Sequence, residues 1–155
     1  MPPSHSRQTR RTWLLIFGSF ILLVVLLGAI CFGVEQRTPP RIINASQVAQ
    51  LRPPIIVTVL IALVGAVVWL RWRVDGKIGD GERDRLMSPQ QFMTDSIVAL
   101  SLTNFCAIFG FEFFFLGASF REFLLFALGK FCVDFACVLP RGLQFWTAHE
   151  SRSSV

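Results

Sequence analysis

The feature that most constrains this chain is an apolar run without a single charge, TWLLIFGSFILLVVLLGAICFGV, which covers residues 12–34. An α-helix rises about 1.5 Å per residue, so about 20 apolar residues cross the roughly 30 Å hydrocarbon layer of a bilayer. The run therefore predicts a transmembrane helix. It is longer than the roughly 7–15 apolar residues of a cleaved signal peptide, and no A-x-A cleavage site follows it, so we expect a retained helix.

Three more apolar runs follow, and together they predict the fold class. The second span is expected at residues 55–72, the third at 97–118 and the fourth at 120–139. The last two are separated by so few residues that they should form an antiparallel hairpin. The sequence thus predicts an all-α, polytopic membrane protein with a single membrane domain, residues 1–155, and four transmembrane helices in two antiparallel hairpins.

Prolines and polar residues mark the segments between the spans. An outer linker is expected at residues 35–54, where Pro39–Pro40 and Pro53–Pro54 should interrupt regular structure. A polar, cytoplasmic loop is expected at residues 73–95. Pro140 is expected to close the fourth span, because proline lacks the N–H group that a helix interior needs.

The composition is typical of a chain whose solvent is lipid. Only 16% of the residues are charged and 53% are hydrophobic, whereas soluble domains carry about 25% charged residues. The net charge of +5 comes from basic residues beside the apolar runs, and no basic stripe alternates with stacking aromatic residues, as binding of single-stranded nucleic acid requires. We therefore expect the lipid bilayer as partner, together with other membrane subunits or further copies of this chain, and no nucleic acid.

The distribution of lysine and arginine predicts the orientation. With four spans, both termini and the 73–95 loop lie on one side of the membrane. Counting Arg71 with that side, it carries ten Lys and Arg residues, against four on the other side. The positive-inside rule assigns the richer side to the cytoplasm. We expect a multi-pass protein of the bacterial inner (plasma) membrane with both termini cytoplasmic.

The residue types that carry most enzyme chemistry are sparse. The two histidines, His5 and His149, lie near opposite ends of the chain, and there is no Ser-His-Asp set, metal-binding cluster or nucleotide-binding loop. The cysteines fall inside the apolar runs without a C-x-x-C pair, as is typical of buried cysteine acting as a small hydrophobe. They are Cys31, Cys106, Cys132 and Cys137. We expect no catalytic residue, no cofactor and no metal, and hence a protein that is not an enzyme.

Charged residues inside the fourth span are candidate functional residues. Lys130 lies about ten residues, and hence about 15 Å, from each end of the span. An unpaired Lys at that depth costs roughly 2.5–3.5 kcal/mol on insertion scales, so it should be paired or face water. Asp134 follows one turn later on the same helical face, which allows an i,i+4 ion pair.

The third span offers two more polar residues at comparable depth. Measured from the turn shared with the fourth span, Glu112 lies about 9 Å deep, whereas Asn104 and Asp134 each lie about 21 Å deep. Glu112 is then within reach of the long Lys130 side chain. Depth alone therefore predicts an intramembrane polar cluster of Asn104, Glu112, Lys130 and Asp134.

Two functions are compatible with such a cluster. A neutralised polar clip would fix how the helices pack, and the protein would then be a structural or accessory subunit of a membrane assembly. A relay of titrating groups would instead serve a small proton- or ion-coupled transporter subunit. A relay needs more than one titrating step across the membrane, and the first two spans provide none, which favours the clip.

Caps and small residues predict how the third span begins and packs. In SPQQ, Ser88 can cap the helix, Pro89 suits its first turn and Gln91 completes a capping box. Small residues then recur every three or four positions, which lets helix backbones approach closely in lipid. They are Ser96, Ala99, Thr103, Ala107 and Gly110.

The stretch NFCAIFGFE, from Asn104 to Glu112, resembles part of the carboxylate-bearing helix of the proteolipid subunits of rotary ATP synthases. In that family an acidic residue is followed six positions later by Gly, with an aromatic residue just before it, and Phe109 and Gly110 match here. Asn104 stands where the ion-binding carboxylate would be, so the resemblance implies shared helix packing without the proton-carrying group. The four-span layout as a whole resembles small four-helix membrane proteins of bacteria.

Overall fold

The computed structural model describes residues 3–37, 42–75 and 87–153, which contain long helices and no strand. The helices are α1 (Pro3–Glu35), α2 (Ala45–Leu70), α4 (Pro89–Leu116), α5 (Phe120–Val133) and α6 (Leu139–Ser153). Two π-helical turns prolong them: η1 (Arg71–Asp75) continues α2, and η2 (Asp134–Val138) joins α5 to α6 without a break.

Among the described residues, four helical segments are long and apolar enough to cross a membrane. They are Gln8–Glu35, Ala45–Asp75, Pro89–Leu116 and Phe120–His149. The predicted fold class, all-α with four candidate spans, is confirmed, and it fits a multi-pass membrane protein. Each segment is longer than the apolar run that predicted it, because the helices continue into their polar flanks.

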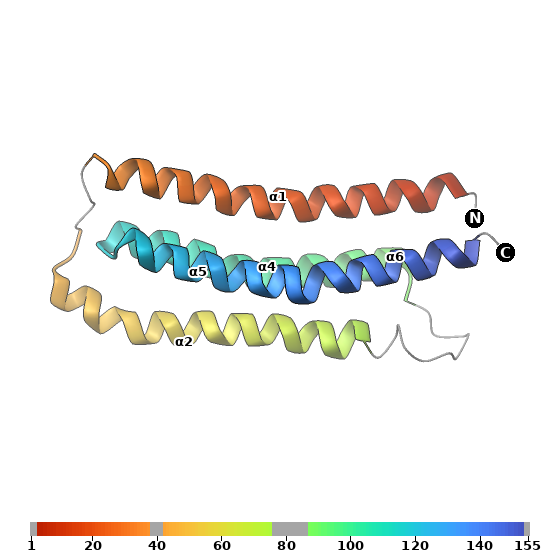
Figure 1. Cartoon of the computed structure of the whole chain (residues 1–155). Helices are drawn as coiled ribbons and strands as arrows, with labels where there is room; N and C mark the ends of the chain where they lie inside the picture. Colours follow the sequence, from red (N-terminus) through yellow and green to blue (C-terminus); the bar gives the residue numbers. More distant parts are fainter. Residues whose placement is uncertain (1–2, 38–41, 76–86, 154–155) are drawn as a thin grey trace.

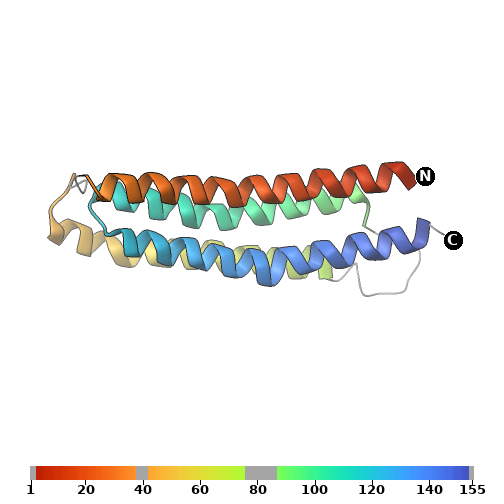
Figure 2. The same ribbon diagram turned by 45° about the horizontal axis from the view of Figure 1, so that its top comes forward.

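The four rods lie side by side, and both termini lie at the same end of the bundle (Figure 1). α1 and α2 run in opposite directions on opposite sides of the bundle, with α4 and the α5–α6 rod between them (Figure 1). In the turned view α1 (orange) lies in front of α4 (teal), and the α5–α6 rod (blue) lies in front of α2 (yellow) (Figure 2). α1 and α2 therefore occupy diagonally opposite corners of the bundle. Of the two antiparallel pairs, α4 and α5 are therefore in direct contact, whereas α1 and α2 are held mainly through the other rods.

α4 is the central helix and contacts α1, α2 and α5. Half of its most apolar stretch is buried inside the bundle (50%), against 17% in α1 and in α2. The small residues that predicted its packing face are all buried; they are Ser96, Ala99, Thr103, Ala107 and Gly110. At Gly110 a Cβ atom would lie only 2.9 Å from the Cβ of Phe126, so glycine there permits the close approach of α4 and α5.

Both ends of α4 follow from local chemistry. The Gln91 N–H donates to Ser88 Oγ at 3.2 Å, and the Ser88 N–H donates to Gln91 Oε1 at 3.3 Å, which is the predicted capping box. At the other end Gly117 has φ of 119°, a left-handed conformation that glycine adopts without strain. The Ala118 N–H then donates to the Phe113 carbonyl at 3.1 Å, and the chain reverses into α5.

The expectation that Pro53–Pro54 would interrupt regular structure was wrong. α2 begins at Ala45, inside the expected linker, and passes through both prolines. Proline in a helix leaves the carbonyl four residues earlier without its N–H donor. Those carbonyls belong to Ala49 and Gln50, which are exposed, so water or lipid headgroups can bind them.

Pro140 does not end the fourth rod either. The π-helical turn η2 directly precedes it, and the rod continues as α6. In η2 the Leu139 N–H donates to the Asp134 carbonyl, five residues back. The shifted register rearranges the hydrogen-bond ladder just before the residue that cannot donate, which lets the helix pass the proline.

Only part of the two expected connecting segments is described. In the outer linker expected at residues 35–54, the helix α2 already begins at Ala45, and residues 38–41 lie outside the described residues. In the loop expected at residues 73–95, most of the described part belongs to η1 and α4, and residues 76–86 lie outside the described residues.

Aromatic side chains form the core at the end that holds the termini. Trp13 of α1, Phe92 of α4 and Trp146 of α6 are each at most 1% exposed. The Phe92 and Phe145 rings are stacked, with centroids 4.2 Å apart. This end of the bundle is therefore joined by aromatic rings of three rods, packed together with aliphatic side chains such as Leu70 and Leu100.

Candidate functional site

Lys130 and Asp134 form an ion pair that is closed off from the bundle surface. Both side chains are 0% exposed, and Lys130 Nζ donates to Asp134 Oδ2. Lys130 lies in the last turn of α5, and Asp134 is the first residue of η2. The structure thus brings together the two charges that sequence spacing placed on one helical face.

A hydroxyl group from α4 faces the second carboxylate oxygen. Thr103 Oγ1 lies 2.8 Å from Asp134 Oδ1 and 3.0 Å from the Leu100 carbonyl oxygen. Its single proton can be donated to either acceptor. Thr103 is itself 0% exposed. Because a buried charge is costly unless it is paired and hydrogen-bonded, a donor at each carboxylate oxygen is what makes this burial tolerable.

Asn104 lies beside this contact without sharing it. It is 6% exposed, and its Oδ1 atom is buried with no hydrogen-bond partner among the described residues. The sequence placed Asn104 at the same membrane depth as Asp134. The structure shows that the residue in contact with Asp134 is Thr103, which directly precedes Asn104. The signal that could have selected Thr103 is its place in the row of small residues on the packing face of α4.

Glu112 lies outside the group, which corrects the predicted four-residue cluster. It is an exposed residue of α4. Thr103 and Glu112 are nine positions apart, which is two and a half turns at 3.6 residues per turn, so they lie on opposite faces of the helix. The group that the structure assembles is Thr103, Lys130 and Asp134, with Asn104 next to it.

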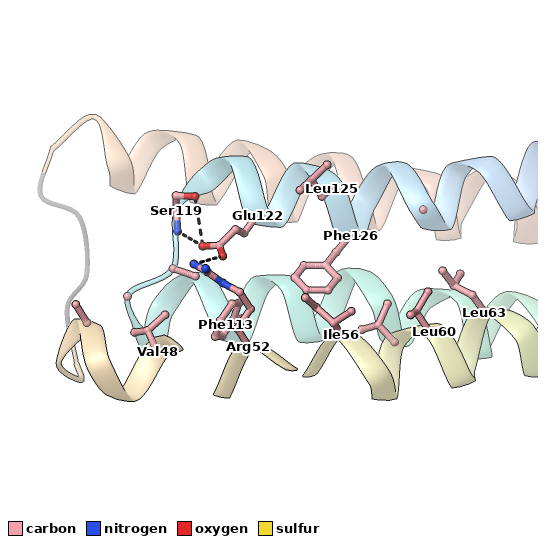
Figure 3. Close-up of a pocket in the computed structure, with 15 residues that line it drawn as sticks. Val48, Arg52, Ile56, Leu60, Leu63, Phe113, Ser119, Glu122, Leu125 and Phe126 are labelled. Atoms are coloured by element: carbon pink, nitrogen blue, oxygen red, sulfur yellow. Dashed lines mark hydrogen bonds and ion pairs between the residues drawn. The ribbon is translucent and has the colours of Figure 1, made fainter. Parts of the chain in front are cut away.

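An apolar groove of about 790 Å³ opens between α2 and α5, in the half of the bundle away from the termini. Phe113 of α4 lies at its base, as Figure 3 shows. Ile56 and Leu60 line it from α2, and Leu125 and Phe126 line it from α5 (Figure 3). Three of the four candidate spans therefore contribute to a cavity that the sequence did not predict.

One end of the groove is polar. Arg52 Nη2 lies 2.7 Å from Glu122 Oε1, so an ion pair links α2 to α5 there (Figure 3). Glu122 Oε2 accepts a hydrogen bond from the Ser119 N–H at 2.9 Å, which also caps the start of α5. From the sequence, Arg52 contributes only to the count of basic residues that predicts the orientation. Its ion pair with Glu122 could not be predicted, because the two residues lie far apart in the chain.

A second set of ion pairs ties the α2 rod to the bundle at its other end. Arg141 of α6 binds Asp75 of η1 with two contacts, Nε to Oδ1 at 2.6 Å and Nη2 to Oδ2 at 2.7 Å. Arg73 Nε lies 3.4 Å from Asp95 Oδ1 on α4. The rod formed by α2 and η1 is thus held by ion pairs at both ends, with the groove beside its first half.

Comparison of the chain with protein-family models, with curated proteins and with solved structures finds no significant match. The resemblances noted from the sequence therefore stay predictions. Within the described ranges, no group of three or more His, Cys, Asp or Glu side chains is arranged to hold a metal ion. The function must be inferred from the geometry of the buried ion pair and of the groove.

Proposed function

We propose that this protein is a non-enzymatic accessory subunit of a membrane assembly, in which the Lys130–Asp134 pair fixes how the helices pack. The main support for the proposal is that this ion pair is completely buried inside the bundle. Both side chains are 0% exposed and bind each other, and Thr103 of α4 covers the remaining carboxylate oxygen. A carrier of protons or ions has to exchange them with both sides of the membrane, and a pair sealed among helices exchanges with neither unless the helices separate.

The large lipid-facing surface supports the accessory role. The most apolar stretches of α1 and α2 are only 17% buried inside the bundle. Leu15 and Ile61 on these helices are 72% and 67% exposed. Such faces can contact lipid or the transmembrane helices of another subunit. Contacts between transmembrane helices in lipid are closest where small residues line the interface.

We infer a bacterial inner membrane from the resemblance of the four-span layout to small four-helix membrane proteins of bacteria, and cytoplasmic termini from the charge distribution. The end of the bundle that holds the termini (Figure 1) belongs to the side with ten of the Lys and Arg residues. Positive residues are retained on the cytoplasmic side of membrane proteins.

The accessory role is tested by isolating the chain, tagged and expressed at its native level, in a mild detergent. Native mass spectrometry of the isolated material is expected to show defined companion subunits. Deletion of the chain should lower the amount of the assembly that contains those subunits. A single mass without companions, together with unchanged membrane assemblies after deletion, would contradict the proposal.

A second candidate function is a proton- or ion-coupled transporter subunit. Asp134 begins the π-helical turn η2, and such turns inside α-helices are frequent at functional sites. The buried Oδ1 of Asn104 nearby has no partner among the described residues. Proteoliposomes that enclose a pH-sensitive dye distinguish the two candidates: flux that requires Asp134 would replace the accessory role, whereas flux equal to that of empty liposomes agrees with it.

A further inference from the structure

We propose that the groove between α2 and α5 binds a phospholipid of the bilayer, with acyl chain between the two helices and phosphate at Arg52. This goes beyond the accessory role proposed above and does not depend on it. Three observations support the assignment: the polarity of the groove along its length, the extent and apolar character of its lining, and the chemistry at its polar end.

The groove changes from polar to apolar along the helix axes. Arg52, Glu122 and Ser119 lie toward one end, beside the small or apolar residues Ala45, Val48 and Ala118, and the opposite end is lined by Leu63 and Gly129. Gly129 follows Ser119 by ten residues, so the groove runs about 15 Å along α5 from the polar end toward the middle of the span. A phospholipid has the same order, with its headgroup at the membrane surface and its chains directed to the midplane.

The length and lining of the groove suit an acyl chain. The lining covers about 27 Å of α2, from Ala45 to Leu63, and about 15 Å of α5. Its walls include the apolar side chains Ile56, Leu60 and Leu125, and a flexible hydrocarbon chain can follow such a space along the helix axes.

The polar end suits a phosphate group. The Arg52 side chain is 52% exposed, and one of its terminal nitrogens is held by Glu122. Arginine carries five N–H donors in a planar fork that matches phosphate oxygens. Glu122 is in turn held by the Ser119 backbone, so the guanidinium is positioned before the ligand arrives.

The deep end of the groove depends on the absence of a side chain. A Cβ atom at Gly129 would lie 3.4 Å from Leu63 Cδ1, an ordinary van der Waals contact. A single methyl group would therefore fit, and a longer side chain would extend into the groove. Gly129→Leu is thus expected to fill the space that we assign to the acyl chain without driving the helices apart.

The experiment compares two ligands with identical acyl chains, dioleoyl phosphatidic acid and dioleoylglycerol, which differ by the phosphate. The full chain is purified in a maltoside detergent, and bound lipid is quantified by native mass spectrometry. We expect one phosphatidic acid per chain, with a dissociation constant at least tenfold lower than that of dioleoylglycerol. Equal binding of the two ligands would overturn the assignment of the phosphate to Arg52.

Matched variants locate the site. Gly129→Leu and Leu125→Trp fill the groove, and each is expected to weaken phosphatidic acid binding at least tenfold. Gly65→Leu and Leu128→Trp make the same replacements at positions that do not line the groove, and they should change binding less than twofold. Arg52→Gln is expected to reduce the preference for phosphatidic acid over dioleoylglycerol at least fivefold.

Two results would overturn the proposal. One is unchanged lipid binding in both groove-filling variants, after circular dichroism has shown that they keep the helical content of the unmodified chain. The other is a dimer that carries no lipid and that dissociates when the groove is filled, because the groove would then be an interface between copies of this chain.

Discussion

At the scale of single residues, the buried pair of Lys130 and Asp134 should be more costly to break than to replace. Removing one partner leaves an uncompensated charge in a place with no solvent, which costs about 3–5 kcal/mol in buried pairs. We expect Lys130→Met alone and Asp134→Leu alone each to destabilise the bundle by that amount. Replacing both by apolar side chains of similar volume should be neutral or stabilising.

Thermal unfolding in detergent, followed by circular dichroism, measures these differences for the two single variants and the double variant. Glu112→Gln is the control, since this exposed residue lies outside the group and surface substitutions usually change stability by less than about 0.5 kcal/mol. A double variant that is as unstable as the worse single variant would contradict the interpretation of the pair as a structural clip.

Thr103 provides a second prediction at this scale. Thr103→Val keeps the shape of the side chain but leaves Asp134 Oδ1 without the donor that now lies 2.8 Å away. A buried acceptor that loses its donor costs about 1–3 kcal/mol. Thr103→Ser retains the hydroxyl and should lose less. Unfolding in detergent compares the two variants, and a loss in Thr103→Ser as large as or larger than that in Thr103→Val would contradict a dominant role of the hydroxyl group.

At the scale of helices, glycines set how closely the rods approach. Gly142 of α6 faces the Trp13 ring of α1, and a Cβ atom added at Gly142 would overlap that ring. Trp13 is only 1% exposed, so the ring has little room to move. We expect Gly142→Ala to cost about 1–3 kcal/mol through overpacking, measured by the same unfolding experiment.

Gly65 of α2 is the matched control, because a Cβ atom there meets nothing within 4 Å. Gly65→Ala should leave stability unchanged or raise it by roughly 0.5–1 kcal/mol, since alanine loses less conformational entropy than glycine in a helix. A loss at Gly65 equal to the loss at Gly142 would mean that glycine itself, rather than the contact with Trp13, decides the outcome.

The prolines show how a helix tolerates a residue that has no backbone N–H to donate. At Pro53–Pro54 the affected carbonyls belong to exposed residues near the start of α2. At Pro140 the turn η2 changes the hydrogen-bond register directly before the proline. The sequence pattern predicts the missing bond in both cases, but whether the helix stops depends on what surrounds the freed carbonyl.

At the scale of the whole molecule, both termini lie at one end of the bundle (Figure 1), and the charge distribution predicts that this end faces the cytoplasm. A fluorescent protein that folds only in the cytoplasm is therefore expected to fluoresce when fused to either terminus. Alkaline phosphatase, which is active only outside the cytoplasm, should stay inactive at the same positions. Opposite results at the two termini would contradict an even number of spans.

Ion pairs near the two ends of the α2–η1 rod link it to the α5–α6 rod, and the groove lies between these two rods. Arg52–Glu122 holds the first half of the α2–η1 rod and Asp75–Arg141 holds its end. Between them α2 lies beside α5 with an open apolar space. α2 also packs against α4 along its length, so the open space lies only on the side of α2 that faces α5, which is the arrangement that a lipid site requires.

The sequence by itself determines the number and approximate position of the spans, the cap at Ser88, and the pairing of Lys130 with Asp134. These features depend on apolar length and on spacing within one helix, which are local properties of the chain. Tertiary structure alone decides that Thr103 rather than Glu112 meets the ion pair, that α1 and α2 lie on opposite sides, and that a groove opens beside α5. The physical reason is that rotation of a helix about its axis, and the space left between two helices, depend on side chains contributed by distant parts of the chain.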